Sequence, residues 1–166
     1  FAFAIWNRAT HELFLARDRT GIKPLYWTRD GKRLRFASTL PALLAGGGVD
    51  ASVDAVALHH QLTLHGLVPA PRTLLNGVRK LAPAHSQTWQ IDGEMAEQRY
   101  WVLNAERPQP DRSEAEWIEA TGEMLVKVVR RQYDTADTPV GVLLSGGLDS
   151  SLLVGLLDRA GVREIP

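Results

Sequence analysis

The sequence contains no cysteine, so its 166 residues cannot form a disulfide, a thiolate zinc site or a cysteine nucleophile. It also lacks any apolar run near the roughly 20 residues that a membrane-spanning helix needs, and its first residues do not form a secretion signal. Basic residues are not clustered as in proteins that bind nucleic acid phosphates. These absences predict a soluble cytoplasmic protein with neither a membrane nor a nucleic acid as partner.

Hydrophobic residues make up 45% of the chain, which is enough for a globular core. The net charge is zero, but basic residues outnumber acidic ones before Val102 and acidic residues outnumber basic ones after it. Residues 104–112 contain Pro108, Pro110 and no apolar residue larger than alanine, which is typical of a linker. We therefore expect one domain over residues 1–103, a linker over 104–112 and a second domain over 113–166.

The first part has short β-type runs separated by turn residues. Residues 2–6, 13–17, 24–28 and 34–38 are predicted to form one antiparallel meander, with a tight turn at Asp30-Gly31. Helices are expected over 40–45 and 52–65, and a further hairpin over 88–91 and 95–101 around Asp92-Gly93. The charged turn over residues 17–21 is expected to be a solvated structural corner.

The second part has helical periodicity followed by one β-α unit. Ser113 and Glu116 have the spacing of a capping box, and an apolar stripe of helical period follows them. The wholly apolar run 140–144 predicts a strand buried on both faces of a parallel sheet. A glycine-rich loop over 145–151 then leads into a helix over 152–159, which Gly161 is placed to stop.

A glycine-rich turn between a buried strand and a helix favours anion binding, because unpaired N–H groups and the positive helix end converge there. The loop Ser-Gly-Gly-Leu-Asp-Ser-Ser does not fit the usual phosphate loop, since it has no lysine and its glycines are adjacent. It also fails the dinucleotide pattern and meets only half of the serine hydrolase elbow.

The motif S-G-G-x-D-S after an apolar run closely resembles the pyrophosphate loop of the N-type ATP pyrophosphatases, in particular that of the glutamine-hydrolysing asparagine synthetases. This resemblance implies a Rossmann-like domain that uses ATP and Mg²⁺, with Asp149 helping to hold the metal on the pyrophosphate and the Leu143 backbone meeting the adenosine. The implied pyrophosphate-binding residues are Ser145, Gly146, Gly147, Leu148, Asp149, Ser150 and Ser151. The alternative is that Asp149 only caps the helix and the glycines only turn the chain.

The runs Phe1-Ala-Phe-Ala-Ile-Trp6 and Arg17-Asp-Arg-Thr-Gly-Ile-Lys-Pro-Leu-Tyr-Trp27 resemble the end of the class II glutamine amidotransferase domain of the same family. The implied fold is the end of an antiparallel β sandwich of the Ntn-hydrolase type with helices, making the whole chain an α/β and α+β fragment. The catalytic cysteine of that domain would lie upstream, so no catalytic residue is assigned. The chain is expected to be a fragment that is inactive by itself.

The resemblance implies glutamine as ammonia donor, aspartate or another carboxylate as acceptor, and a possible homodimer. Thr39 stands where asparagine synthetases usually carry an acidic residue, and residues 59–81 resemble the N-acetylglutaminylglutamine amidotransferases. The main expectation is therefore asparagine formation through an acyl-adenylate, with release of AMP and pyrophosphate. The alternatives are a sister amidotransferase or a non-catalytic ATP-binding module.

Overall fold

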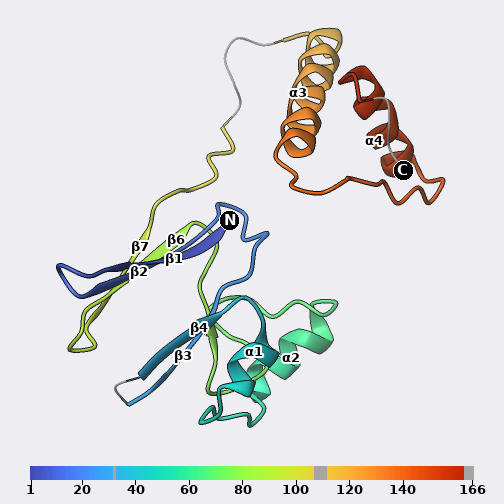
Figure 1. The fold of residues 1–166 in the computed structure, drawn as a ribbon. Helices are drawn as coiled ribbons and strands as arrows, with labels where there is room; N and C mark the ends of the chain where they lie inside the picture. The colour runs from blue at the N-terminus through green and yellow to red at the C-terminus, as the bar shows by residue number, and fades with distance from the viewer. Residues whose placement is uncertain (32, 107–111, 163–166) are drawn as a thin grey trace. The chain divides into compact units, whose positions relative to one another are not determined.

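The computed structural model describes residues 1–31, 33–106 and 112–162, and the chain divides into two compact units, Phe1–Ala105 and Glu106–Pro166 (Figure 1). Most of the predicted linker and the last four residues lie outside the described ranges. The elements of the first unit are β1 (Ala2–Asn7), β2 (Glu12–Arg17), β3 (Tyr26–Asp30), β4 (Arg33–Ala37), α1 (Leu40–Ala45), α2 (Ala55–Thr63), β5 (Arg79–Lys80), β6 (His85–Trp89) and β7 (Met95–Arg99). Those of the second unit are α3 (Glu114–Asp134) and α4 (Leu148–Arg159).

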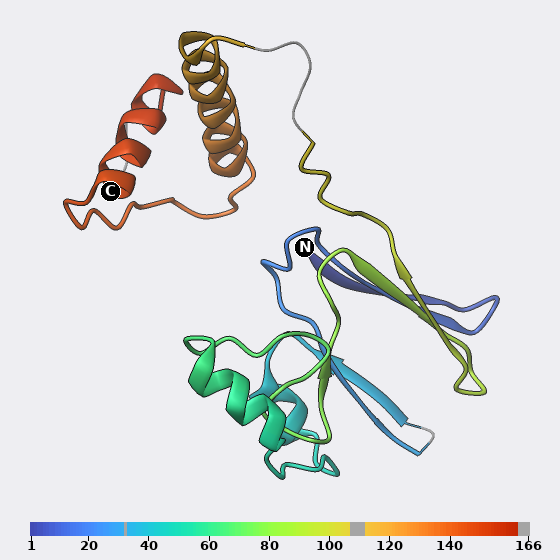
Figure 2. The same ribbon diagram turned by 180° about the vertical axis from the view of Figure 1, so that it is seen from behind.

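The strands of the first unit form two antiparallel sheets (Figure 2). One sheet has the order β1-β2-β6-β7 and the other the order β4-β3-β5. Leu15 of β2 faces Gln87 of β6, so the longer sheet joins residues far apart in the sequence. Together with the helices, this confirms a mixed α/β chain with antiparallel sheets.

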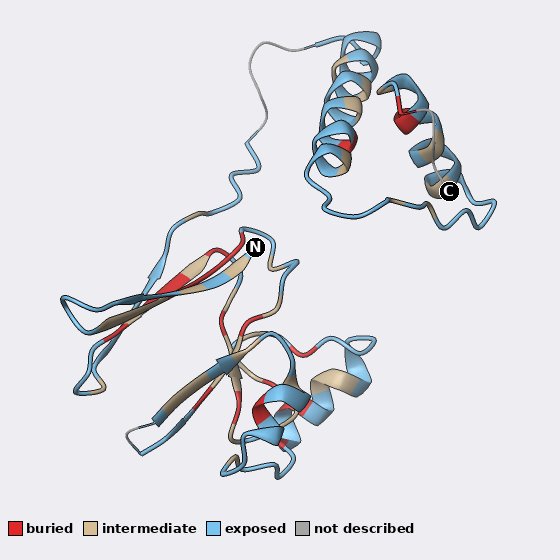
Figure 3. Ribbon diagram, in the orientation of Figure 1, coloured by how far each residue is buried: buried red, intermediate tan, exposed pale blue. Residues whose placement is uncertain are grey.

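The hydrophobic core of this unit draws on both sheets. Leu15, Leu25, Leu81 and Trp89 are buried at its centre, and Trp27 of β3 packs against them. The rings of Trp27 and Trp89 meet edge to face with centroids 5.2 Å apart, an arrangement that aromatic quadrupoles favour. Figure 3 shows the buried segments gathered along these strands.

The predicted single meander is wrong, because its four strands divide between the two sheets. β1 pairs with β2, and β3 pairs with β4, but β2 takes β6 as its second neighbour instead of β3. The turn that follows β2 redirects the chain, since the guanidinium of Arg17 donates to the carbonyl oxygens of Gly21, Lys23 and Leu81. Contacts remote in sequence therefore decide which strands become neighbours.

The two helices of the first unit begin at capping side chains. Thr39 Oγ1 accepts the N–H of Ala42 at the start of α1, which has the predicted bounds. Asp54 caps α2 by accepting the N–H groups of Val56 and Ala57. The helix predicted over 52–65 is thus shorter at both ends, because Asp54 takes the cap position and α2 ends at Thr63.

The second unit begins with the predicted capping box, which is confirmed. Ser113 Oγ accepts the N–H of Glu116, and the Ser113 N–H donates to Glu116 Oε2 over 2.8 Å. Val129 of α3 packs with Leu156, Leu157 and Val162 in a small core. Gly161 has a φ of 80°, as expected for a glycine that ends a helix.

The strand predicted over residues 140–144 does not form. No strand is present in the described part of this unit, 112–162, so the extended segment has no ladder partner for its N–H and C=O groups. Leu143 is 96% exposed and Leu144 is 62% exposed, whereas a strand of a parallel sheet would bury both. The Rossmann-like arrangement of this region therefore stays a prediction.

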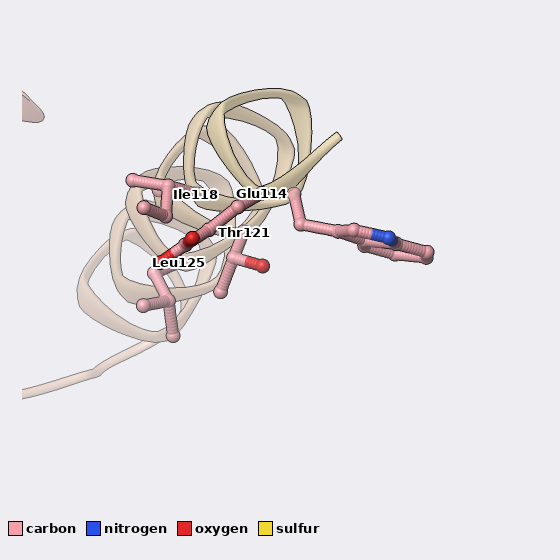
Figure 4. A pocket seen from close by; sticks show the side chains of 6 residues that line it. Glu114, Ile118, Thr121 and Leu125 are labelled. Atoms are coloured by element: carbon pink, nitrogen blue, oxygen red, sulfur yellow. The ribbon is translucent and has the colours of Figure 1, made fainter. Parts of the chain in front are cut away.

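The apolar stripe of α3 is only partly covered. Ile118, Thr121 and Leu125 line a shallow hollow on one side of this helix, together with Glu114 (Figure 4). Ile118 is 67% exposed.

Among the described residues, no helix has the length and apolar character required to cross a bilayer.

Candidate functional site

The loop over residues 145–151 connects the extended segment to α4. Gly146 has a φ of 78°, a left-handed conformation that glycine adopts without strain, and no atom lies within 4 Å of the position of a Cβ there. Gly147 is the N-cap residue of α4, and the helix begins at Leu148, four residues before the predicted start. The predicted pyrophosphate-binding residues therefore form one continuous turn around the start of this helix.

The hydroxyl groups of two serines form hydrogen bonds within the turn. Ser145 Oγ and Ser150 Oγ are 3.1 Å apart, and Ser150 Oγ donates to the carbonyl oxygen of Gly147 over 3.1 Å. The N–H of Gly147 donates to Ser145 Oγ at 3.4 Å. The structure thus brings together Ser145 and Ser150, which the sequence had placed only in the same loop.

The start of α4 has open hydrogen-bond donors. Among the described residues no side chain caps the start of α4, so the first-turn N–H groups of Leu148, Asp149 and Ser150 have no side-chain acceptor there. The Ser151 N–H already donates to the Gly147 carbonyl oxygen over 3.1 Å as part of the helix. Unpaired N–H groups at the positive end of a helix are suited to a phosphate group.

Asp149 lies in the first turn of α4 and is exposed. Among the described residues, no group of three or more histidine, cysteine, aspartate and glutamate side chains could hold a metal ion. Mg²⁺ characteristically combines one or two carboxylates with substrate phosphates and water, and Asp149 fits this role as the only acidic residue of the loop. A metal ion would therefore depend on the nucleotide for most of its ligands.

Leu143 and Leu148, the two apolar residues in the predicted set, are both open to solvent. Leu143 is 96% exposed, and the side chain of Leu148 contributes little to the core because the residue is 84% exposed. None of the loop residues, 145–151, is buried by the unit to which it belongs.

The charged turn after β2 is only in part the solvated corner that its composition predicts, because Arg19 and Thr20 are exposed but the two residues before them are buried. Arg17 is 9% exposed and Asp18 is 8% exposed. The Asp18 carboxylate accepts the N–H groups of Thr20, Ile22 and Lys23. This carboxylate is the centre of a buried polar network that holds the turn.

Burial acts to raise the pKa of Asp18, but the hydrogen bonds from the N–H groups of Lys23 and Ile22 outweigh it. These hydrogen bonds hold the pKa well below its usual range. An aspartate at the start of a turn commonly accepts the N–H groups of the residues that follow it, so the turn can be recognised from the sequence. The burial of that aspartate, in contrast, depends on residues far away in the chain. Sequence reasoning therefore could have found the turn but not the network.

Two family models match successive parts of the chain. Residues 1–101 match the glutamine amidotransferase domain, and residues 120–165 match asparagine synthase. The first match covers most of the first unit and the second includes the whole loop over 145–151. These two matches follow the order that the two sequence resemblances predict.

Curated relatives match across both parts. Asparagine synthetase [glutamine-hydrolyzing] 3 of Bacillus subtilis is 36% identical over 94% of this chain and 25% of its own length. Putative asparagine synthetase [glutamine-hydrolyzing] 2 of Methanocaldococcus jannaschii is 33% identical over 95% of this chain and 30% of its own length. Amidase chry2 of Gibberella zeae is 33% identical over 96% of this chain and 23% of its own length.

The chain thus spans between a quarter and a third of the length of the first two relatives and slightly less of the third. The two family models together span the first unit and the loop at the start of α4. On these matches, the chain belongs to the glutamine-hydrolysing asparagine synthetase family.

Proposed function

We propose that the whole protein is an ATP-dependent amide synthetase that takes ammonia from glutamine and joins it to a carboxylate. The observation that supports this most strongly is the open helix start at Gly147, where three N–H groups lack side-chain acceptors within a loop of the family's sequence. Such a site is suited to the pyrophosphate that leaves when ATP is cleaved between its α and β phosphates.

In the proposed reaction, an oxygen of the acceptor carboxylate attacks the α-phosphorus, and the bond to the bridging oxygen breaks with its electron pair leaving on pyrophosphate. Ammonia then attacks the carbonyl carbon, loses a proton and displaces AMP. The N–H groups of Leu148, Asp149 and Ser150 stabilise the charge that develops on the pyrophosphate. Mg²⁺ would neutralise part of this charge, with Asp149 as its protein ligand.

The other loop residues have supporting roles in this proposal. Gly146 and Gly147 allow the phosphate oxygens to approach the backbone, since neither carries a Cβ. The hydroxyl groups of Ser145, Ser150 and Ser151 add hydrogen bonds, and the backbone of Leu143 meets the adenosine. The division into a glutaminase domain over 1–103 and a synthetase domain from 113 onward belongs to the same proposal.

Aspartate is the proposed acceptor, which would make the product asparagine. One observation favours a second candidate, a sister amidotransferase that acts on another carboxylate, such as a glutamine dipeptide. Thr39 stands where the family usually carries an acidic residue, and in the structure its hydroxyl group caps α1 instead. A non-catalytic ATP-binding module is the remaining alternative.

The test is the exchange of labelled pyrophosphate into ATP by the whole protein, measured with aspartate and with a glutamine dipeptide. Exchange with aspartate supports asparagine synthesis, and exchange with the dipeptide alone supports the sister activity. If no carboxylate supports exchange, the proposed adenylation is wrong.

The variant Asp149→Ala is expected to lower the exchange rate by about a hundredfold or more and to leave the release of ammonia from glutamine unchanged. The matched control is Asp158→Ala, which removes an exposed carboxylate from the last turn of the same helix. Equal loss in both variants would contradict a role for Asp149 at the pyrophosphate.

A further inference from the structure

A small cavity with a partly polar lining lies within the first unit, between α1, α2 and the sheet that contains β3 and β5. It has a volume of about 170 Å³. Its polar lining includes Tyr26, Gln61 and Lys80, and Leu40, Val68 and Leu74 supply apolar walls. This volume is well above the roughly 10–15 Å³ that a single water molecule needs, so the cavity has room for a small organic anion.

The strand register places two of the polar residues beside each other. Tyr26 of β3 is the direct partner of Lys80 of β5, so their side chains leave the same face of the sheet. Gln61 reaches the cavity from α2, and its Nε2 lies 3.5 Å from the position of a Cβ on Gly66. Three hydrogen-bonding residues from separate elements thus line one small space.

Within the described part of the chain, these side chains have no hydrogen-bond partner. No hydrogen bond forms there at the Lys80 ammonium, the Tyr26 hydroxyl or the Gln61 side-chain amide. No described carboxylate lies within ion-pairing distance of Lys80. Thr73, which also lines the cavity, is already bonded to Val78 and Leu75. These groups, one cation and two neutral donors, are half-exposed and open to water, so a ligand can reach them.

The electrostatic surroundings favour an anion. Burial, followed by the positive charge of Arg17, lowers the pKa of Lys80 from its usual value. Arg17 donates to three neutral carbonyl oxygens, which do not neutralise its charge. Asp18 accepts backbone N–H groups of its own turn. A bound anion would offset the repulsion between the two cations.

We infer that this cavity binds a small monocarboxylate, with its oxygens on the Lys80 ammonium, the Tyr26 hydroxyl and the Gln61 amide, and its short carbon chain against Leu40, Val68 and Leu74. A single lysine in the cavity matches a single negative charge, and three apolar walls match a carbon chain. Phosphate, with more charge and no apolar part, fits this lining less well. This inference goes beyond the proposed function and does not depend on it.

The test uses propionate as the ligand and the whole protein. Acetic anhydride labels lysine amines, and mass spectrometry gives the rate for each lysine. Propionate is expected to slow labelling of Lys80 in a saturable manner, whereas labelling of Lys127, which is exposed on α3, stays unchanged. Absence of protection overturns the inference, as does equal protection of both lysines. Inorganic phosphate that protects Lys80 as well as propionate would indicate an adventitious ion only and would also overturn it.

Tyr26→Phe removes one donor and keeps Lys80 available for labelling. The concentration of propionate that gives half protection is expected to rise about fivefold in this variant, the effect of one lost hydrogen bond. Tyr133→Phe, in the second unit, is the matched control and should leave that concentration unchanged. An unchanged value in Tyr26→Phe would contradict the proposed contact, and the measurement on the unmodified protein stands whether or not the variant folds.

Discussion

Two aspartates of the first unit and one of the second are placed in opposite ways. In the first unit, Asp18 and Asp54 are buried and accept backbone N–H groups, so each holds a turn or a helix start in place. In the second unit, Asp149 is exposed at a helix start that no side chain caps. The difference indicates that Asp18 and Asp54 maintain the fold of the first unit, whereas the open N–H groups beside Asp149 are those that the proposed function assigns to a ligand.

The largest effect that tests this comparison is expected from Asp18→Ala. The variant removes a buried carboxylate and leaves the N–H groups of Thr20, Ile22 and Lys23 without their acceptor. We expect the free energy of unfolding of the first unit to fall by about 3 kcal/mol, because hydrogen bonds to a buried charged group are strong. Hydrogen exchange of the backbone amides, measured by mass spectrometry on the whole protein, reports this value unit by unit.

The control is Asp134→Ala, which removes an exposed carboxylate that pairs with Arg130 in α3. Its expected effect is about 0.5 kcal/mol.

Acid should also separate the effect of Asp18→Ala from that of Asp134→Ala. The folded-state pKa of Asp18 is depressed, so its stabilisation is present above its usual value of 3.8 and is lost as the pH falls below it. The difference between the unmodified protein and Asp18→Ala should therefore shrink in acid, and a constant difference would contradict the role of the charge.

A smaller effect is expected from replacing a glycine in each unit. A Cβ at Gly77 would lie 2.7 Å from the backbone N and O of Asp50, so Gly77→Ala should destabilise the first unit by about 2 kcal/mol. At Gly146 no atom lies within 4 Å, and Gly146→Ala should add only the strain of a positive φ, about 1 kcal/mol. Hydrogen exchange again measures both. Equal losses of stability would contradict the difference between the crowded position of Gly77 and the open position of Gly146.

Local patterns in the sequence predicted local structure well. The bounds of α1, the capping box at Ser113 and Glu116, and the turn at Asp92-Gly93 all depend on residues close in the chain, and the structure contains each of them. The loop over 145–151 was also identified from seven adjacent residues. Its hydrogen bond between Ser145 and Ser150 could not be read from the sequence, since it depends on the path of the turn.

The predictions that failed depended on partners far away in the sequence. Whether β2 pairs with β3 or with β6 is decided by contacts such as that between Arg17 and Leu81, which lie 64 residues apart. The burial of Asp18 has the same origin. The run over 140–144 has the composition of a buried strand, but composition does not provide the neighbouring strand that its backbone requires.

The smallest expected effect is the most informative about the open helix start. Gly147→Ser would supply a side-chain cap to α4, and the backbone at Gly147 is already extended, with a φ of −77° and a ψ of 165°. A serine cap is better than glycine by a few tenths of a kcal/mol, so α4 should become slightly more stable. The same hydroxyl group would occupy an N–H that the proposed function assigns to pyrophosphate. Exchange of labelled pyrophosphate into ATP should therefore decrease as stability increases.

A gain in stability alone must be separated from this effect. Gly155 lies within α4, and a Cβ there would meet no atom within 4 Å, so Gly155→Ala should stabilise the helix by about 0.5–1 kcal/mol. Because this glycine is remote from the loop, its variant should exchange pyrophosphate at the unmodified rate. If both variants lose exchange, rigidity of α4 is the cause. If Gly147→Ser keeps full exchange, the open N–H groups are not the pyrophosphate site, and the contrast between the two units has no functional meaning.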